Sequence, residues 1–88
     1  MSGQPPTRYV RADDLVWRLA RDRVLVRRVG DHSDAAAIDL LGAAAVVWVA
    51  AEEPLTSDEL AAETELSPAT IADSIELLVG GRWMAEAP

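Results

Sequence analysis

The spacing of apolar residues changes once along this chain, near its middle, and that change constrains the fold more than any other feature. Before it, residues 15–20 and 24–29 are short runs rich in β-branched residues with three polar residues between them, which predicts a β-hairpin. Residues 35–40 then alternate, with Ile38 and Leu40 on one face, as in a third strand. The first half is therefore predicted to form a small antiparallel sheet.

After the change, the pattern is that of helices. Residues 41–53 are apolar on nearly all sides, which predicts a helix that is buried on most sides and has Trp48 near its middle. Pro54 is expected to end this helix, because proline lacks the N–H that a helix interior needs.

Two further helices are indicated by their capping residues. Thr56 and Glu59 have the spacing of a capping box and predict a short helix that ends at about residue 65. Ser67 followed by Pro68 predicts the N-cap and first position of a third helix. That helix is expected to end at residue 79, because two glycines follow it.

Together these elements predict an α+β fold that is winged-helix-like, with a three-stranded antiparallel sheet followed by a three-helix bundle. We expect a flexible N-terminal tail over residues 1–12 and one domain over residues 13–86. Trp83 and Met84 follow the third helix and are expected to pack back on the core.

Charge is divided unevenly between the two halves of the chain. The first 30 residues carry seven arginines and three aspartates, a net charge of +4. The remaining residues carry one arginine and twelve acidic residues, a net charge of −11. The acidic half is expected to repel nucleic acid and to favour a basic peptide.

The composition also bears on where such a chain works. It has no cysteine, so disulfides and thiolate chemistry are excluded. The longest apolar run covers 12 residues, 40–51, which is too short to cross a bilayer. The polar, proline-containing start lacks the apolar stretch of a signal peptide. We expect a soluble cytoplasmic protein with no membrane partner.

The second and third predicted helices, joined by a tight turn, are similar to a helix-turn-helix. A winged helix-turn-helix DNA-binding regulator is therefore the alternative function. However, residues 67–81 contain no basic side chain, while Asp73 and Glu76 lie on the polar face of the third helix. Because phosphate contacts supply most non-specific affinity for DNA, we expect no nucleic-acid partner.

The first helix and the strand before it resemble the signature of the PqqD-like proteins, also called RiPP recognition elements. That signature has a leucine before an asparagine, then small residues, then Ile-Trp. Here Leu40, Ala44-Ala45 and Val47-Trp48 occupy the matching positions. Arg23-Val24-Leu25-Val26 is similar to the family's second strand, and residues 55–60 are similar to its step into the second helix.

The resemblance covers residues 17–84, with two departures. Leu41 stands where the family has the asparagine that would cap the first helix. Alanines at 35–37 stand where bulkier strand residues are common, which implies a wider or shallower groove.

The resemblance implies a non-catalytic peptide-binding module. Such a module captures the leader segment of a ribosomally synthesised precursor peptide by strand addition and presents it to modifying enzymes. The leader would add to the edge of the third strand and lie against the third helix. Its implied contacts are Ala35, Ala36, Ala37 and Ile38 on the strand and Thr70, Asp73, Ser74, Leu77 and Leu78 on the helix.

Other roles for these residues and surfaces remain open. The alternative for Ile38, Leu77 and Leu78 is a place in the core, and for Ile38 and Leu78 that role is at least as expected as peptide contact. The implied partners are the leader peptide and a modifying enzyme or leader protease of the same pathway. A third class of function is a structural domain that forms a homodimer through the exposed edge of the third strand.

Catalysis is not expected. His32 is the only histidine and lies in a polar loop, and with no second histidine and no cysteine neither a metal site nor a Ser-His-acid arrangement is expected. No glycine-rich nucleotide motif is present. We therefore predict no enzyme activity, no catalytic residue, no cofactor and no metal.

Overall fold

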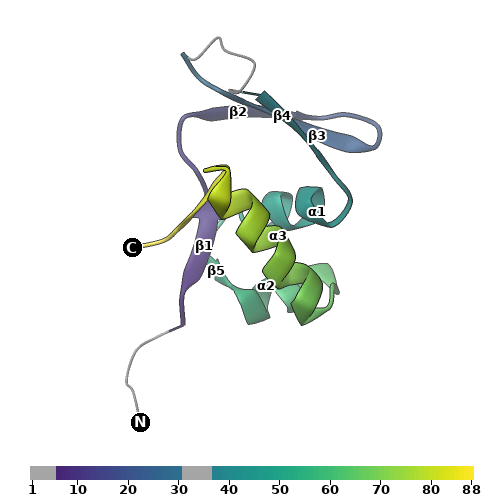
Figure 1. The fold of residues 1–88 in the computed structure, drawn as a ribbon, viewed down its shortest axis with the longest axis vertical. Helices are drawn as coiled ribbons and strands as arrows, with labels where there is room; N and C mark the ends of the chain where they lie inside the picture. Colours follow the sequence, from purple (N-terminus) through teal and green to yellow (C-terminus); the bar gives the residue numbers. More distant parts are fainter. Residues whose placement is uncertain (1–5, 31–36) are drawn as a thin grey trace.

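The computed structural model describes residues 6–30 and 37–88 (Figure 1). Four strands come first in this part of the chain, and two shorter strands lie among and after the three helices that follow. The strands are β1 (Arg8–Arg11), β2 (Leu15–Leu19), β3 (Arg23–Arg28), β4 (Ala37–Leu41), β5 (Leu55–Thr56) and β6 (Met84–Glu86). The helices are α1 (Gly42–Ala50), α2 (Ser57–Thr64) and α3 (Pro68–Gly80).

The three strands predicted for the first half form one antiparallel sheet in the order β2-β3-β4. Trp17, Val26 and Ile38 lie opposite one another across it, so they share a face. That inner face packs on α1 and also carries Val24 and Leu40, both buried. The helices all lie on one side of this sheet, which leaves its outer face uncovered in the described part of the chain (Figure 1).

A second antiparallel sheet has the order β5-β1-β6. The fold is thus α+β, as predicted, but its layout differs from one sheet followed by a helical bundle. The tail expected over residues 1–12 is wrong for Arg8–Arg11, which forms the central strand of this second sheet. β5 and β6 have only two and three residues, and both pair with a strand that is far away in the sequence. Such short strands have no recognisable local pattern, so they were not predicted.

The capping signals at α2 and α3 are confirmed. The backbone N–H of Glu59 donates to Thr56 Oγ1 (3.1 Å), and the backbone N–H of Thr56 donates to Glu59 Oε1 (2.9 Å). Ser67 Oγ accepts a hydrogen bond from the backbone N–H of Thr70 (3.2 Å) at the start of α3. These bonds satisfy N–H groups that a helix start leaves without a partner.

The start of α1 is different. Its N-cap residue, Leu41, makes no side-chain capping bond, and β4 runs directly into the helix. Gly42 turns the chain there with a φ of +57°, in the left-handed region that favours glycine. α1 ends at Ala50 rather than residue 53, and Val46 and Val49 on it are exposed. The expectation of a helix buried on most sides is therefore wrong for this side of α1.

One continuous core joins the inner face of the β2-β3-β4 sheet to the helices. Trp48 is 0 % exposed at its centre, as predicted. The indole N–H of Trp48 donates to the carbonyl of Trp83 (2.9 Å), so the residues after α3 do pack back on the core. The other buried apolar residues are Val24, Val26, Leu40, Val47, Ala51, Leu60, Ile71, Ile75, Leu78 and Met84.

Two arginines of the basic half tie the first-half strands to the ends of helices. The guanidinium of Arg11 lies between the rings of Trp17 (4.8 Å) and Trp48 (4.6 Å) and donates to carbonyls in the last turn of α1. Arg28 lies over Trp83 (4.5 Å) and donates to two carbonyls just after α3. Cations at helix C-termini are favourable, so part of the charge asymmetry stabilises the fold.

Candidate peptide-binding site

The hydrogen bonds of the β2-β3-β4 sheet determine which backbone groups are free at its edges. At the β2–β3 hairpin, the N–H of Ala20 donates to the carbonyl of Arg23 (2.8 Å). In an antiparallel sheet, successive residues direct their N–H and C=O groups to opposite sides. Arg23 and every second residue of β3 therefore bond to β2, and the residues between them bond to Leu40 and Ile38 of β4.

It follows that Ala37, Asp39 and Leu41 direct their N–H and C=O groups away from β3. β4 is an edge strand, and no other strand in the described part of the chain pairs with that side of it. The N–H groups of all three residues and the carbonyls of Ala37 and Asp39 thus form a row to which an extended peptide can add, while the Leu41 carbonyl belongs to the first turn of α1.

The strand residues predicted to bind peptide differ in how exposed they are. Ala35 and Ala36 lie outside the described residues. Ala37 is exposed on β4 and belongs to the free row. The Ile38 side chain is half-buried and packs against the core, so it holds β4 on the helices rather than facing a bound peptide.

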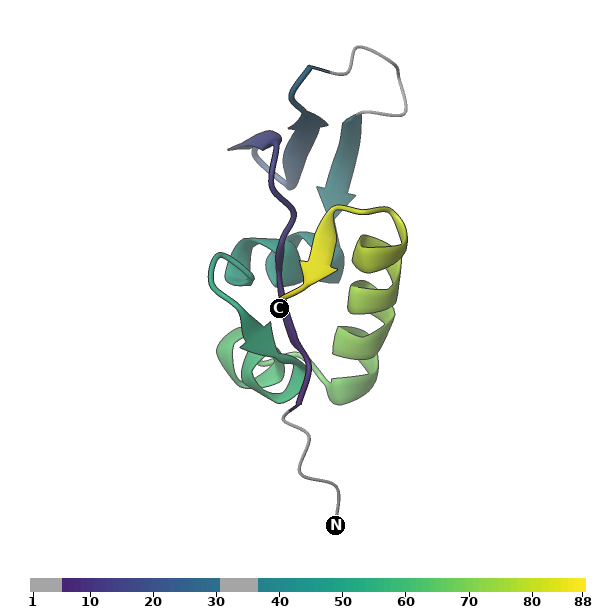
Figure 2. The ribbon, with the colours of Figure 1, turned by 90° about the vertical axis from the view of Figure 1, so that its left-hand side faces the viewer.

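The five helix residues divide in the same way. Ser74 and Leu78 are buried, Leu78 completely, and belong to the core. Thr70 is half-buried, Asp73 is exposed, and Leu77 is 58 % exposed. β4 lies on the same side of the molecule as α3, above the end at which α3 finishes (Figure 2). Thr70, Asp73 and Leu77 are thus the accessible residues of the predicted helix wall, and Thr70 lies in the first turn of α3, at the end away from β4.

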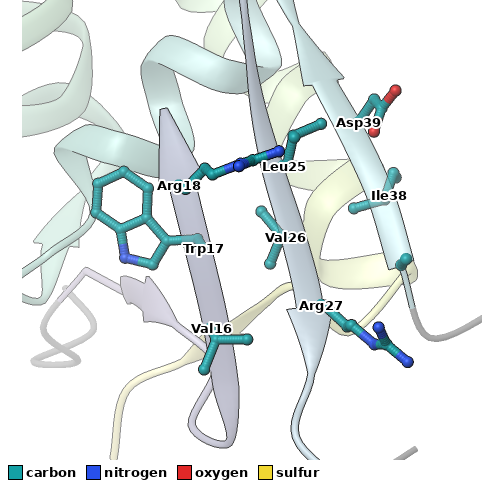
Figure 3. A pocket seen from close by; sticks show the side chains of 9 residues that line it. Val16, Trp17, Arg18, Leu25, Val26, Arg27, Ile38 and Asp39 are labelled. Atoms are coloured by element: carbon teal, nitrogen blue, oxygen red, sulfur yellow. The ribbon is translucent and has the colours of Figure 1, made fainter. Parts of the chain in front are cut away.

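The sequence analysis missed a hollow of about 500 Å³ on the sheet itself (Figure 3). It spans all three strands, and register places Arg18, Leu25 and Asp39 in one row of the outer face. The sequence did carry a signal for this face. Arg18 lies between Trp17 and Leu19 on β2, and Arg27 follows the buried Val26 on β3, so alternation places both arginines on the face away from the core. The residues that line the hollow are Val16, Trp17, Arg18, Leu25, Val26, Arg27, Ala37, Ile38 and Asp39.

Charges differ on the two sides of the β4 edge. On the outer face, Arg23 donates to Asp22 and to Asp39 (3.3 Å), and these bonds, first that to Asp22, raise the pKa of Arg23. Arg18, in the same face, makes no hydrogen bond or ion pair within the described residues. On the helix side, α3 has no basic residue and exposes Asp73 and Glu76. The outer face at the β4 edge thus presents Asp39 with Arg23 bonded to it, while the charged side chains of α3 are acidic.

Comparison with protein-family models, with curated proteins and with solved structures finds no match for this chain. Among the described residues, no group of three or more histidine and acidic side chains is placed to hold a metal ion. No helix in the same part of the chain has the length and apolar character needed to cross a membrane.

Proposed function

We propose that this chain is a non-catalytic module that binds the leader segment of a ribosomally synthesised precursor peptide. The leader adds as a strand to the open edge of β4, and the module presents it to a modifying enzyme or leader protease of the same pathway. The resemblance to the PqqD-like proteins suggests this role.

The observation that carries the proposal is the outward row of Ala37, Asp39 and Leu41 on an edge strand. Main-chain hydrogen bonds to such an edge give affinity for an extended peptide, and side-chain contacts on either side give specificity. Ala37 has a small side chain, so a peptide backbone can approach it closely.

The charges around the edge favour a particular pattern in the bound segment. Successive side chains of a strand point to opposite faces. Side chains on the helix side would lie toward Asp73 and Leu77, which favours basic and apolar residues. Side chains on the outer side would lie next to Asp39 and its partner Arg23, which favours polar residues that can bond to either of them. We therefore expect a leader in which basic or apolar residues alternate with polar ones.

Ala37→Pro tests the proposal directly. The Ala37 N–H points away from β3, so proline removes a donor from the free row without removing a bond of the host sheet. The assay is fluorescence anisotropy of a labelled leader peptide, taken from a precursor gene next to the gene for this chain. We expect binding to weaken about tenfold or more, since a lost hydrogen bond and a displaced backbone act together.

The matched control is Leu19→Pro, at the other edge of the same sheet, which should leave peptide affinity unchanged. Circular dichroism of both variants establishes that the sheet is intact. Asp73→Arg should change affinity by about 1 kcal/mol with little effect on stability. If the folded Ala37→Pro variant binds the leader as tightly as the unchanged chain, strand addition at β4 is wrong.

A further inference from the structure

The other edge of the sheet carries an exposed apolar surface that peptide binding at β4 does not use. Leu19 on β2 is 73 % exposed, and Val46 and Val49 on α1 are exposed beside it. These three side chains line a second hollow, of about 240 Å³, between the hairpin and α1. Small proteins seldom leave neighbouring apolar side chains on two elements uncovered, and such surfaces commonly contact a partner.

The backbone of β2 is also free along this side. Hydrogen bonds from Ala20 to Arg23 and from Val29 to Asp14, both 2.8 Å, fix the pairing at the two ends of the hairpin. By the alternation of an antiparallel pair, Arg18 and Val16 bond to β3. Leu15, Trp17 and Leu19 then direct their N–H and C=O groups outward, and no other strand in the described ranges pairs with them.

The sequence of β2 is complementary to itself when two copies run antiparallel. In the register centred on Trp17, each Leu15 lies opposite the other copy's Leu19 and the two Trp17 residues lie opposite each other. Val16 then lies opposite Arg18, so no two like charges of β2 lie directly opposite each other. The three outward residues would form three hydrogen-bonded pairs, and Leu15 would be placed beside the exposed Leu19 at the edge of the apolar hollow.

We infer that the occupant of this edge is a second copy of the chain. Two β2 strands pair about a two-fold axis through Trp17, which joins the two sheets into one of six strands and covers the apolar surface on each α1. The contact is isologous, so it closes at a dimer. Both β4 edges stay free, and the inference does not depend on the proposed function.

β4 does not have this self-complementarity. The register that pairs all five of its residues with a second copy places Asp39 opposite Asp39, two like charges facing one another. The homodimer considered from the sequence, joined through the third strand, is therefore the less favourable arrangement. In this arrangement β2 pairs with β2 of a second copy, and β4 stays open for a different chain.

Sedimentation equilibrium of the full chain tests the inference. At a concentration on the order of 100 µM we expect a species of twice the 9.5 kDa chain mass that dissociates on dilution. Leu19→Pro removes an outward N–H but no bond of the host sheet, and should raise the dimer dissociation constant by about tenfold or more. Leu19→Lys, which places a charge on the edge without changing the backbone, should have the same effect.

Ala37→Pro is the matched control, since it makes the same change at an outward position of the other edge. It should leave the dimer intact. A monomeric chain throughout the concentration range would overturn the inference. So would a dimer that Ala37→Pro dissociates and Leu19→Pro does not. Loss of leader binding in Ala37→Pro with an intact dimer separates this result from that of the proposed function.

Discussion

Replacement of Trp48 offers the sharpest test of how the core is assembled. The side chain is fully buried, its ring meets Trp17 edge to face with centroids 5.2 Å apart, and its N–H donates to the carbonyl of Trp83. Truncation of a buried tryptophan to alanine costs about 3–5 kcal/mol, and the aromatic pair adds about 0.5–1.5 kcal/mol. A domain of this size has about 5–15 kcal/mol in total, so Trp48→Ala should be close to unfolded.

Trp48→Phe separates the apolar burial of the ring from its hydrogen bond to Trp83. It keeps most of the apolar burial but removes the N–H, leaving the Trp83 carbonyl without its buried partner, at a cost of about 1–3 kcal/mol. Urea unfolding followed by circular dichroism measures both variants without relying on tryptophan fluorescence. Trp17→Ala is the control, since Trp17 is partly exposed and should cost less. A free energy of unfolding within about 1 kcal/mol of the unchanged chain for Trp48→Ala would refute this view of the core.

Three further outcomes follow from the structure. Arg11→Met should lower the free energy of unfolding in urea by about 1–3 kcal/mol, because it removes two ring contacts and two hydrogen bonds to carbonyls of α1. Equal stability of Arg11→Met and the unchanged chain would show that these contacts do not stabilise the fold. The hydrogen bond from the Thr56 N–H, followed by contacts with Arg8, lowers the pKa of Glu59. Its contribution to stability is therefore complete above the ordinary carboxyl pKa and is lost as pH falls through the lower folded pKa, so Glu59→Gln should reduce the loss of stability on acidification in pH-dependent thermal melts. An anisotropy titration with duplex DNA at physiological salt should show no binding, because α3 exposes only acidic charge; sub-micromolar, sequence-selective binding would favour a regulator instead.

Local signals predicted the elements well wherever a single segment carried the information. The capping box at Thr56 and the Ser67-Pro68 pair placed α2 and α3 within a residue or two, because capping depends on neighbouring residues alone. The hairpin followed from two apolar runs with a short connection. β1 was missed because its stability comes from strands that lie far away in the sequence.

The candidate site was predicted only in outline. Alternation along β4 placed Ile38 toward the core, but the free row of backbone groups depends on which side of β3 bonds to β2. Helical spacing put Ser74 and Leu78 close to the accessible stripe of α3, and it takes tertiary packing to show that both are buried. The hollow on the outer face exists only because three strands bring their side chains together.

Hydrogen exchange of individual backbone amides, followed by NMR with and without the leader peptide, tests strand addition most directly. In the free chain, the amides of Ile38 and Leu40 should be protected by β3, while those of Ala37, Asp39 and Leu41 exchange quickly. Bound leader should protect the latter three amides and leave the first two as they were. Peptide binding that leaves Ala37, Asp39 and Leu41 exchanging as fast as before would contradict the account.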